Sequence, residues 1–465
     1  MTGQNSNKSF DAIIIGTGQA GAPLAEFLAG KGKSVAIIEK HFVGGSCINY
    51  GCTPSKSMIA SAKISYFINR AKDYGIRTSK PKIDMPKVIK RKKKIVESFR
   101  NRKEKSLIEN KNITLIKGIA SFVDQRNISI TLNEGGTQNI STEKIFINTG
   151  GRPAIPSIQG IEKIDYLTST SILELKEVPD HLLILGGGYI GLEFGQMFRR
   201  FGSEVTIIDH NDQLLKREDK DIADEIKKIF EEDGINILLN KNVEKIEKTG
   251  KGKIRLILKG KEKITGTHLL IAAGHVPNTN EINLSASGIE TDEKGYIKVN
   301  DKLETNVQGI YALGDVKGGP AFTHISYDDF RIIRDNLDNP NSASINGRFI
   351  PYVVFIDPQL GRIGLNEKEA KRSGKNILVG KIPMSYIARA IEVDETRGLM
   401  KVIVDADTEE ILGCSILGIE GGELMAMIQI AMMGKLKYTA LKEGIFTHPT
   451  LAESLNTLFG NLGKM

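Results

Sequence analysis

Two strand–helix–strand units, each built around closely spaced glycines, constrain the fold of this chain more than any other feature. In the first unit a short apolar strand over 11–15 runs directly into Gly16, Gly18 and Gly21, and an Ala- and Leu-rich helix follows. A second apolar strand is followed at once by Glu39. Glycines allow a tight turn and the close approach of a pyrophosphate, the helix N-terminus favours phosphate, and the carboxylate suits ribose hydroxyls. The unit therefore predicts a bound dinucleotide.

The second unit repeats this pattern further along the chain. A strand over 181–185 precedes Gly186, Gly188 and Gly191, and the next strand leads to Asp209. In both units the acid follows the last glycine by 18 residues, since 39 − 21 and 209 − 191 are equal. Two such units predict two dinucleotides and an α/β fold.

Asp209 also bears on which nicotinamide dinucleotide the second unit takes. Its carboxylate would accept a hydrogen bond from a ribose 2′-hydroxyl and would repel a 2′-phosphate, which favours NADH over NADPH. His210, Lys216 and Arg217 follow closely and keep NADPH as the alternative.

Size and charge exclude some classes of function. The chain has 465 residues, enough for roughly two to four domains. Lys plus Arg exceed Asp plus Glu by 64 − 56 = 8, and the run 90–94 is densely basic. Because no aromatic interleaving or nucleic-acid motif accompanies that run, a solvated helix face is favoured over a DNA or RNA patch. We expect no nucleic-acid partner.

The chain also lacks the marks of a membrane or secreted protein. No apolar run approaches the roughly 18 residues of a membrane span, and residues 1–10 are polar without a signal-type apolar core. We expect a soluble, cytoplasmic protein with no membrane partner. Three cysteines then suit a catalytic pair better than a structural framework.

Cys47 and Cys52 are the main candidates for thiol chemistry, in the segment 44–56, GGSCINYGCTPSK. In a regular α-helix, residues five apart lie roughly 8.7 Å apart between Cα atoms, which exceeds disulfide reach. If the two sulfurs bond, Cys47 must lie before the helix or in a distorted first turn, with 49–51 as a flexible hinge and Pro54 near the helix start. Cys52 would then lie at a helix N-terminus, which lowers the pKa of a thiol.

This segment is typical of a working disulfide. Inert buried cysteines would normally be surrounded by apolar residues, whereas these lie among glycines, Asn49 and Lys56. A zinc site would usually need tighter spacing and a second pair of ligands, so we expect no metal here. Cys414 lies in a strand-like run and is expected to be buried and inert.

The remaining elements indicate two dinucleotide domains followed by an α+β domain suited to association. Helical patterns cover 57–70, 86–110 and 422–434, and strand signals cover 113–122, 128–132, 144–148, 253–258, 268–271, 309–313, 352–356, 399–404 and 411–417. We predict an α/β fold with two Rossmann-like domains and a C-terminal α+β dimerisation domain.

Together these features resemble the class I pyridine nucleotide-disulfide oxidoreductases, such as dihydrolipoamide dehydrogenase, glutathione reductase and mercuric reductase. Several motifs occur in the same order as in this family. They are the paired glycine units, the C-x4-C pair, Thr149-Gly150, Ala273-Gly274, Gly314-Asp315 and His448-Pro449-Thr450 with Glu453. The segments GTGQAGAPLAEFLAGKGKSVAIIEK and GDVKGGPAFTHISYDDFRII are most similar to the mercuric-reductase-like branch that includes reductases of reactive-chlorine stress.

The resemblance implies domains and cofactor sites. The domains are an FAD-binding domain with the redox disulfide over 1–150 and 280–346, an NAD(P)H-binding domain over 151–279 and a dimerisation domain over 347–465. Residues expected to hold FAD are Gly16, Gly18, Gly21, Glu39, Lys56, Gly118, Thr149, Gly150, Asp315, Ala321 and His324. Residues expected to hold NAD are Gly186, Gly188, Tyr189, Gly191, Asp209, Val243 and Gly274. Tyr189 would cover the nicotinamide pocket, with a packed aromatic residue as the alternative.

The resemblance also implies catalytic roles. Electrons would pass from NADH through the flavin to Cys52, and Cys47 would attack the substrate. Lys56 would lie near the flavin N5 and pair with Glu193, although sequence alone favours two surface charges.

A histidine near the C-terminus would complete the centre. His448 would act as general acid/base, held by Glu453, in the other subunit's site, which requires a homodimer. Pro449 suits a helix start and would place His448 at its N-cap.

Departures from the family bear on the substrate. The chain shows no vicinal cysteine pair at its C-terminus and no heavy-metal domain at its N-terminus, which disfavours mercuric ion, and His275 stands where relatives often have Arg. We expect a small oxidant such as hypothiocyanous acid, or a metal ion. The alternatives are dihydrolipoamide dehydrogenase, whose His and Glu the HPTLAE segment matches, and a flavin-bound redox sensor without turnover.

Overall fold

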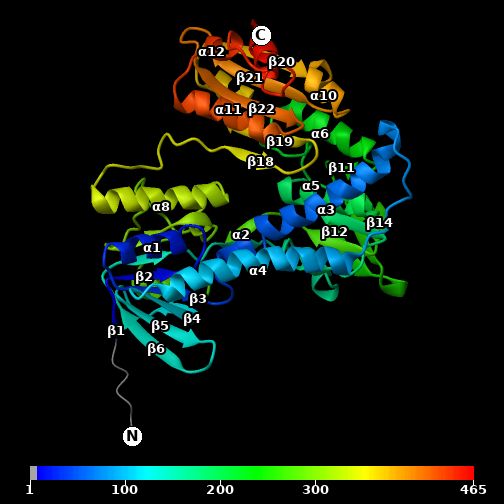
Figure 1. Ribbon diagram of the computed structural model, residues 1–465. Coiled ribbons are helices and arrows are strands. Elements are labelled where there is room, and N and C mark those ends of the chain that lie inside the picture. Colours follow the sequence, from blue (N-terminus) through cyan, green and yellow to red (C-terminus); the bar gives the residue numbers. More distant parts are fainter. Residues whose placement is uncertain (1–7, 465) are drawn as a thin grey trace. The chain divides into compact units, whose positions relative to one another are not determined.

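The computed structural model describes residues 8–464, which fall into two compact units (Figure 1). The first unit contains the chain up to Met58, Pro86–Ala154 and Gly274–Arg348, and the second contains Ile59–Met85, Ile155–Ala273 and the chain from Phe349 onward. The prediction that the chain has no signal segment rests on the polar residues 1–10. Of these, residues 1–7 lie outside the described residues. Within 8–464, no helix is long and apolar enough to cross a membrane.

The first unit is organised around an eight-stranded sheet of order β1-β6-β5-β4-β3-β2-β7-β17. Its strands are β1 (Lys8–Ser9), β2 (Ala12–Ile15), β3 (Val35–Glu39), β4 (Ile113–Phe122), β5 (Asn127–Leu132), β6 (Thr137–Ser141), β7 (Ile145–Ile147) and β17 (Ile310–Ala312). From β4 through β3, β2 and β7 to β17 the strands pair in parallel, whereas β4 pairs antiparallel with β5. The long β4 therefore joins a Rossmann-like sheet to an antiparallel extension.

Both faces of the parallel strands are covered, which explains why these strands are continuously apolar. Ile14 of β2 packs in a core that includes residues of α1 (Gly21–Gly30) and α8 (Thr323–Asp338), together with Leu107 of α4 (Met85–Glu109). Ile13 and Ile15 pack in a separate core with residues of β4, β5 and β17. The carboxyl ends of these strands carry the glycine turn and the polar residues of the site.

The second unit contains a parallel sheet of order β11-β10-β9-β15 and an antiparallel sheet of order β18-β19-β22-β21-β20-β23. The strands are β9 (His181–Leu185), β10 (Glu204–Ile208), β11 (Asn236–Leu238), β15 (His268–Ile271), β18 (Tyr352–Val354), β19 (Gln359–Gly364), β20 (Ile377–Pro383), β21 (Leu399–Asp405), β22 (Ile411–Gly418) and β23 (Leu462–Lys464). Its helices include α5 (Tyr189–Phe201), α6 (Lys220–Glu232), α10 (Ala388–Glu392), α11 (Gly421–Met433), α12 (Tyr438–Lys442) and α13 (Ser454–Gly460).

Three further strands, β12 (Val243–Lys248), β13 (Ile254–Leu258) and β14 (Lys263–Gly266), form an antiparallel sheet in the second unit. In the first unit, β8 (Gly151–Pro153) pairs with β16 (His275–Pro277). The mixed architecture, with one parallel sheet and one sheet that is parallel over five of its strands, confirms the predicted α/β class, while the predicted domain boundaries stay a prediction.

Most predicted elements are present, with instructive omissions. The strands predicted at 181–185 and 268–271 are confirmed at those bounds, and the helix predicted over 422–434 is α11. The sequence did not indicate β19 or β20, because Gly361, Gly380 and Pro383 weaken their strand signal. A methyl group at Gly361 would overlap the carbonyl oxygen of Gly421, so the close approach of α11 requires the glycine that hides the strand.

Phe146 of β7 provides a test of the first unit's core. Its side chain is fully buried and stacks on Tyr311 with ring centroids 5.0 Å apart. We expect Phe146→Ala to lower the free energy of unfolding by about 3–5 kcal/mol, because the lost ring leaves a cavity. Ile119→Ala, on exposed surface of β4, should cost under about 1 kcal/mol. Urea denaturation followed by circular dichroism measures both, and equal effects would contradict the assigned packing.

Candidate active site

The two cysteines lie on two separate helices. Cys47 lies in α2 (Gly45–Asn49), and Cys52 is the first residue of α3 (Cys52–Arg70). Tyr50 and Gly51 separate the helices, so the predicted hinge exists but is one residue shorter than predicted. Asn49 remains helical because its side-chain amide donates to the carbonyl oxygens of Val43 and Gly45, at 2.9 Å each, and thereby holds the α2 turn together.

The surroundings of the thiols distinguish their roles. The Cys52 sulfur lies 3.2 Å from the Thr323 hydroxyl, at the first turn of α8. A hydrogen bond with Cys52, burial and the negative charge of Cys52 raise the pKa of the Cys47 thiol, whereas Thr323 and Lys56 act in the opposite direction. Both cysteines are free thiols, so their disulfide stays a prediction. Their hydrogen bond indicates that the two thiols lie in direct contact.

The cysteine helix packs directly on the first glycine turn. A methyl group at Gly45 would come 2.7 Å from the Cα atom of Gly18, and Gly45 has a positive φ of 64°. The amide of Gly44 donates to the Thr17 hydroxyl at 3.0 Å, and that hydroxyl donates to Glu39 at 2.5 Å. The acid predicted to bind ribose therefore also ties the turn to the cysteine segment.

Asn148, which follows β7, is a residue beside the glycine turn that sequence reasoning missed. Its side-chain oxygen accepts from the amide of Gly21 at 2.9 Å, and its side-chain nitrogen donates to the carbonyl of Leu313 at 2.9 Å. It thereby holds the start of α1 beside the segment that carries Asp315. A polar residue closing the apolar run IFI was the available signal.

Other groups around this turn remain available for a ligand. The hydroxyl of Thr149 is buried without a hydrogen-bond partner. Burial raises the pKa of Asp315, and the nearby carboxylate of Asp329 adds to this, whereas Lys317 lowers it. A buried hydroxyl, a buried carboxyl and a glycine turn that leaves no room for side chains fit a dinucleotide.

The other predicted FAD residues lie in the same unit. Gly118 lies in β4, where a methyl group would come 2.5 Å from the carbonyl oxygen of Thr131. Ala321 lies just before α8, and His324 in its first turn stacks on Phe322 at 5.4 Å. Gly150 follows Thr149 with a positive φ of 68°. Their contacts with the cofactor stay a prediction.

The second glycine turn has the same construction in the second unit. Methyl groups at Gly186 and Gly191 would overlap backbone carbonyl oxygens. Asp209 is buried and accepts from the amide of Gly187 at 2.5 Å and from the amide and side chain of Asn211 at 2.7 Å each. Its carboxylate is therefore fixed beside the turn, where a ribose is expected.

The remaining predicted NAD residues lie near the starts of α5 and β12 and in the first unit, and their contacts with NAD stay a prediction. Tyr189 is the first residue of α5, Gly188 precedes it, and Val243 begins β12. Gly274 belongs to the first unit, has φ of 116°, and leaves open space where a side chain would lie.

Lys56 and Glu193 belong to different compact units. Lys56 lies in the second turn of α3. Glu193 is buried in α5 and accepts from the amide of Phe355 at 2.9 Å. Their predicted pairing stays a prediction.

His448 is joined to Glu453 as the sequence led us to expect. Its Nδ1 lies 2.8 Å from a Glu453 carboxylate oxygen, while 68% of the histidine side chain is exposed. The predicted helix start at Pro449 is wrong, because α13 begins at Ser454. The side chain of Asn456, in the first turn of α13, donates to three carbonyls of residues 441–444, and these hydrogen bonds attach the start of α13 to the end of α12.

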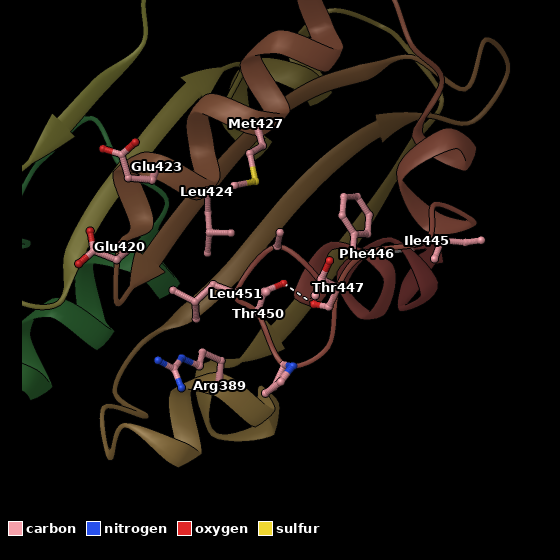
Figure 2. A pocket seen from close by; sticks show the side chains of 12 residues that line it. Arg389, Glu420, Glu423, Leu424, Met427, Ile445, Phe446, Thr447, Thr450 and Leu451 are labelled. Carbon is pink, nitrogen blue, oxygen red and sulfur yellow. Dashed lines mark hydrogen bonds between the residues drawn. The ribbon is translucent and has the colours of Figure 1, made fainter.

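A hollow of about 790 Å³ lies beside this histidine (Figure 2). Its wall includes Thr447 and Pro449, the two sequence neighbours of His448, and Leu424 and Met427 of α11. The exposed ring and the largely apolar wall give this part of the second unit, between α10, α11 and residues 445–452, the character of a contact surface.

Comparisons with known proteins cover nearly the whole chain. Residues 10–329 match the family described as "Pyridine nucleotide-disulphide oxidoreductase", and residues 350–459 match its dimerisation domain. The chain is 40% identical over 454 residues to "Probable pyridine nucleotide-disulfide oxidoreductase RclA" of Escherichia coli (strain K12), covering 97% of this chain and 98% of that protein. It is 36% identical to "Mercuric reductase" of Lysinibacillus sphaericus, covering 96% and 81%.

A solved structure is similar along the same length. The "Cu(II) complex of HOCl-induced flavoprotein disulfide reductase RclA from Escherichia coli" has a TM-score of 0.90 and 39% identity, covering 98% of this chain and 99% of that chain.

Removal of the Cys52 sulfur should make Cys47 more reactive. Cys52→Ala deletes the hydrogen bond and the charge that raise the pKa of Cys47, and a lower pKa gives a larger thiolate fraction at a fixed pH. We expect iodoacetamide to label Cys47 in the reduced variant at least about threefold faster at about pH 8. Mass spectrometry of labelled peptides measures the rate.

Cys414→Ala is the matched control and should leave the labelling of Cys47 unchanged. Cys414 itself should stay unlabelled in the folded protein, because it is buried and burial raises its pKa to about 12. An unaltered Cys47 rate in Cys52→Ala would show that Cys52 does not control this thiol.

Proposed function

Because this chain belongs to the pyridine nucleotide-disulphide oxidoreductase family, we propose that it passes electrons from NAD(P)H through FAD to Cys47 and Cys52 and on to a small oxidant. The family binds FAD and uses pyridine nucleotides, and the matches confirm the predicted family and its branch. The observation that carries the proposal is the hydrogen-bonded cysteine pair packed against a dinucleotide-type glycine turn. Bound FAD would supply a two-electron carrier between nicotinamide and disulfide.

The proposed acceptor is hypothiocyanous acid or a chemically similar oxidant, with a metal ion as the second candidate. The Escherichia coli relative is described as HOCl-induced, which supports the oxidant. The same structure is described as a Cu(II) complex, and other relatives are named mercuric reductases, which supports the metal ion.

The two thiols have different roles in the reduction of such an oxidant. The Cys47 thiolate attacks the sulfur of HOSCN, a Cys47–SCN bond forms, and hydroxide leaves. The Cys52 thiolate then attacks the Cys47 sulfur, which forms the disulfide and releases thiocyanate. Thr323 and the positive charge of Lys56 stabilise negative charge at this pair. Because the pKa of Cys47 is raised, the first attack needs a base.

His448 is the proposed base, acting in the site of a partner subunit. Glu453 engages Nδ1, so Nε2 is the nitrogen left to take the proton from Cys47. The match to the dimerisation domain and the exposed apolar face of α11 support a homodimer. That face includes Met427, Ile430 and Met433, whose exposures are 41%, 69% and 62%.

NADH is the proposed electron donor rather than NADPH. The carboxylate of Asp209 is fixed beside the second glycine turn and would repel a 2′-phosphate. His210 and two exposed cations, Lys216 and Arg217, follow in the next loop and would be the groups that tolerate NADPH.

A substrate panel tests the proposed reaction. We expect oxidation of NADH by hypothiocyanous acid, measured at 340 nm, with a higher kcat/KM than for NADPH. Cys47→Ser should lower this turnover at least about 100-fold, because the nucleophile is lost. Cys414→Ser, the same change at a buried thiol, should leave it unchanged. Strong turnover with dihydrolipoamide alone would instead assign a dihydrolipoamide dehydrogenase, and slow flavin reduction by NADH would indicate a sensor.

Mixed dimers test the position of His448. Homodimers of Cys47→Ser and of His448→Ala should both be nearly inactive. After equal amounts are unfolded and refolded together, half of the dimers carry one of each chain, and one of their two sites has both intact groups. Activity should therefore recover to about one quarter of the wild-type value. No recovery would show that His448 acts within its own subunit.

A further inference from the structure

The loop that follows Asp209 is attached to the second glycine turn. The amide of Leu215 donates to the carbonyl of Gly187 at 3.1 Å, and Leu215 has a φ of +45°, which non-glycine residues rarely adopt. Leu214 is buried against the same turn, since a methyl group at Gly187 would come 2.7 Å from its side chain. This loop therefore borders the expected adenosine end of the second nucleotide.

The far end of the loop is tied to the C-terminal sheet. Glu218 is buried, and its carboxylate accepts a short hydrogen bond from the hydroxyl of Tyr352 in β18. Its other oxygen lies 3.4 Å from the guanidinium of Arg362 in β19. The amide of Glu218 also donates to the carbonyl of Leu215 at 2.7 Å, so the residue that carries the buried carboxylate is bonded directly to the strained residue.

The charges around Glu218 make this attachment specific. Burial raises the pKa of Glu218, whereas Arg362 and the Tyr352 hydroxyl lower it. A buried carboxylate that loses such partners is strongly unfavourable, so the loop has few alternative positions. At the end of the loop, Asp219 contacts Lys401 of β21 at 2.9 Å, which gives the loop a second anchor on the same sheet.

We propose that Tyr352, Glu218 and Arg362 are positioning residues for the nicotinamide dinucleotide. Through them the C-terminal sheet fixes the loop beside Gly187 and Asp209, although none of the three is proposed to touch the nucleotide. The inference rests on the proposed use of a pyridine nucleotide at the second glycine turn. Phe355, the residue directly after β18, donates its amide to Glu193 of α5.

Tyr352→Phe tests the proposal, because it removes one hydroxyl and keeps the ring. We expect the KM for NADH to rise about fivefold, with kcat at saturating NADH and the KM for the oxidant within about twofold of wild type. Calorimetry should show the same fivefold weakening for ADP-ribose, a probe that needs no turnover. Tyr438→Phe, in α12 of the same domain, is the matched control and should change neither quantity.

Glu218→Gln separates positioning from general destabilisation. Its amide oxygen can still accept from Tyr352, so its ADP-ribose affinity should fall less than that of Tyr352→Phe. Unchanged ADP-ribose affinity in Tyr352→Phe would overturn the proposal, whether or not its melting temperature falls. If wild-type protein binds ADP-ribose but does not oxidise NADH, the proposed function fails while the binding comparison still decides the role of the cluster.

Discussion

The contact between the cysteine helix and the first glycine turn is the constraint on which the site depends. Gly45 faces Gly18 with no room for a side chain, and Thr17 links Gly44 to Glu39. A contact made by backbone atoms sets a shorter and more rigid spacing than side chains would allow. The thiols are consequently held at a fixed distance from the turn that suits a pyrophosphate.

Polar residues at the strand ends extend this constraint through the first unit. Asn148 connects the start of α1 to Leu313, and Asp329 accepts from the amide of Gly314 at 2.8 Å. Buried polar groups are usually paired in this way, which makes the buried and unpaired hydroxyl of Thr149 informative. Because the neighbouring polar groups are hydrogen-bonded and the Thr149 hydroxyl is not, this hydroxyl is suited to bind a polar ligand.

The C-terminal part of the chain joins two features that the proposals use. The segment between α12 and α13 presents an exposed histidine bonded to Glu453, and the sheet holds the loop next to the second glycine turn through Tyr352. Buried charge pairs are costly unless well matched, so their presence between the sheet and the loop indicates a need for definite placement. One domain would thus serve proton transfer, nucleotide positioning and subunit contact.

The sequence by itself determined the glycine turns, the acids Glu39 and Asp209 and the cysteine pair, because their backbone and chemical demands are confined to short segments. Only the tertiary structure decided which distant residues complete them. The contacts Gly21–Asn148, Cys52–Thr323 and Glu218–Tyr352 span 127, 271 and 134 residues and leave no local pattern. The start of α13 at Ser454, where Asn456 bonds to carbonyls of residues 441–444, likewise did not follow the local preference of proline.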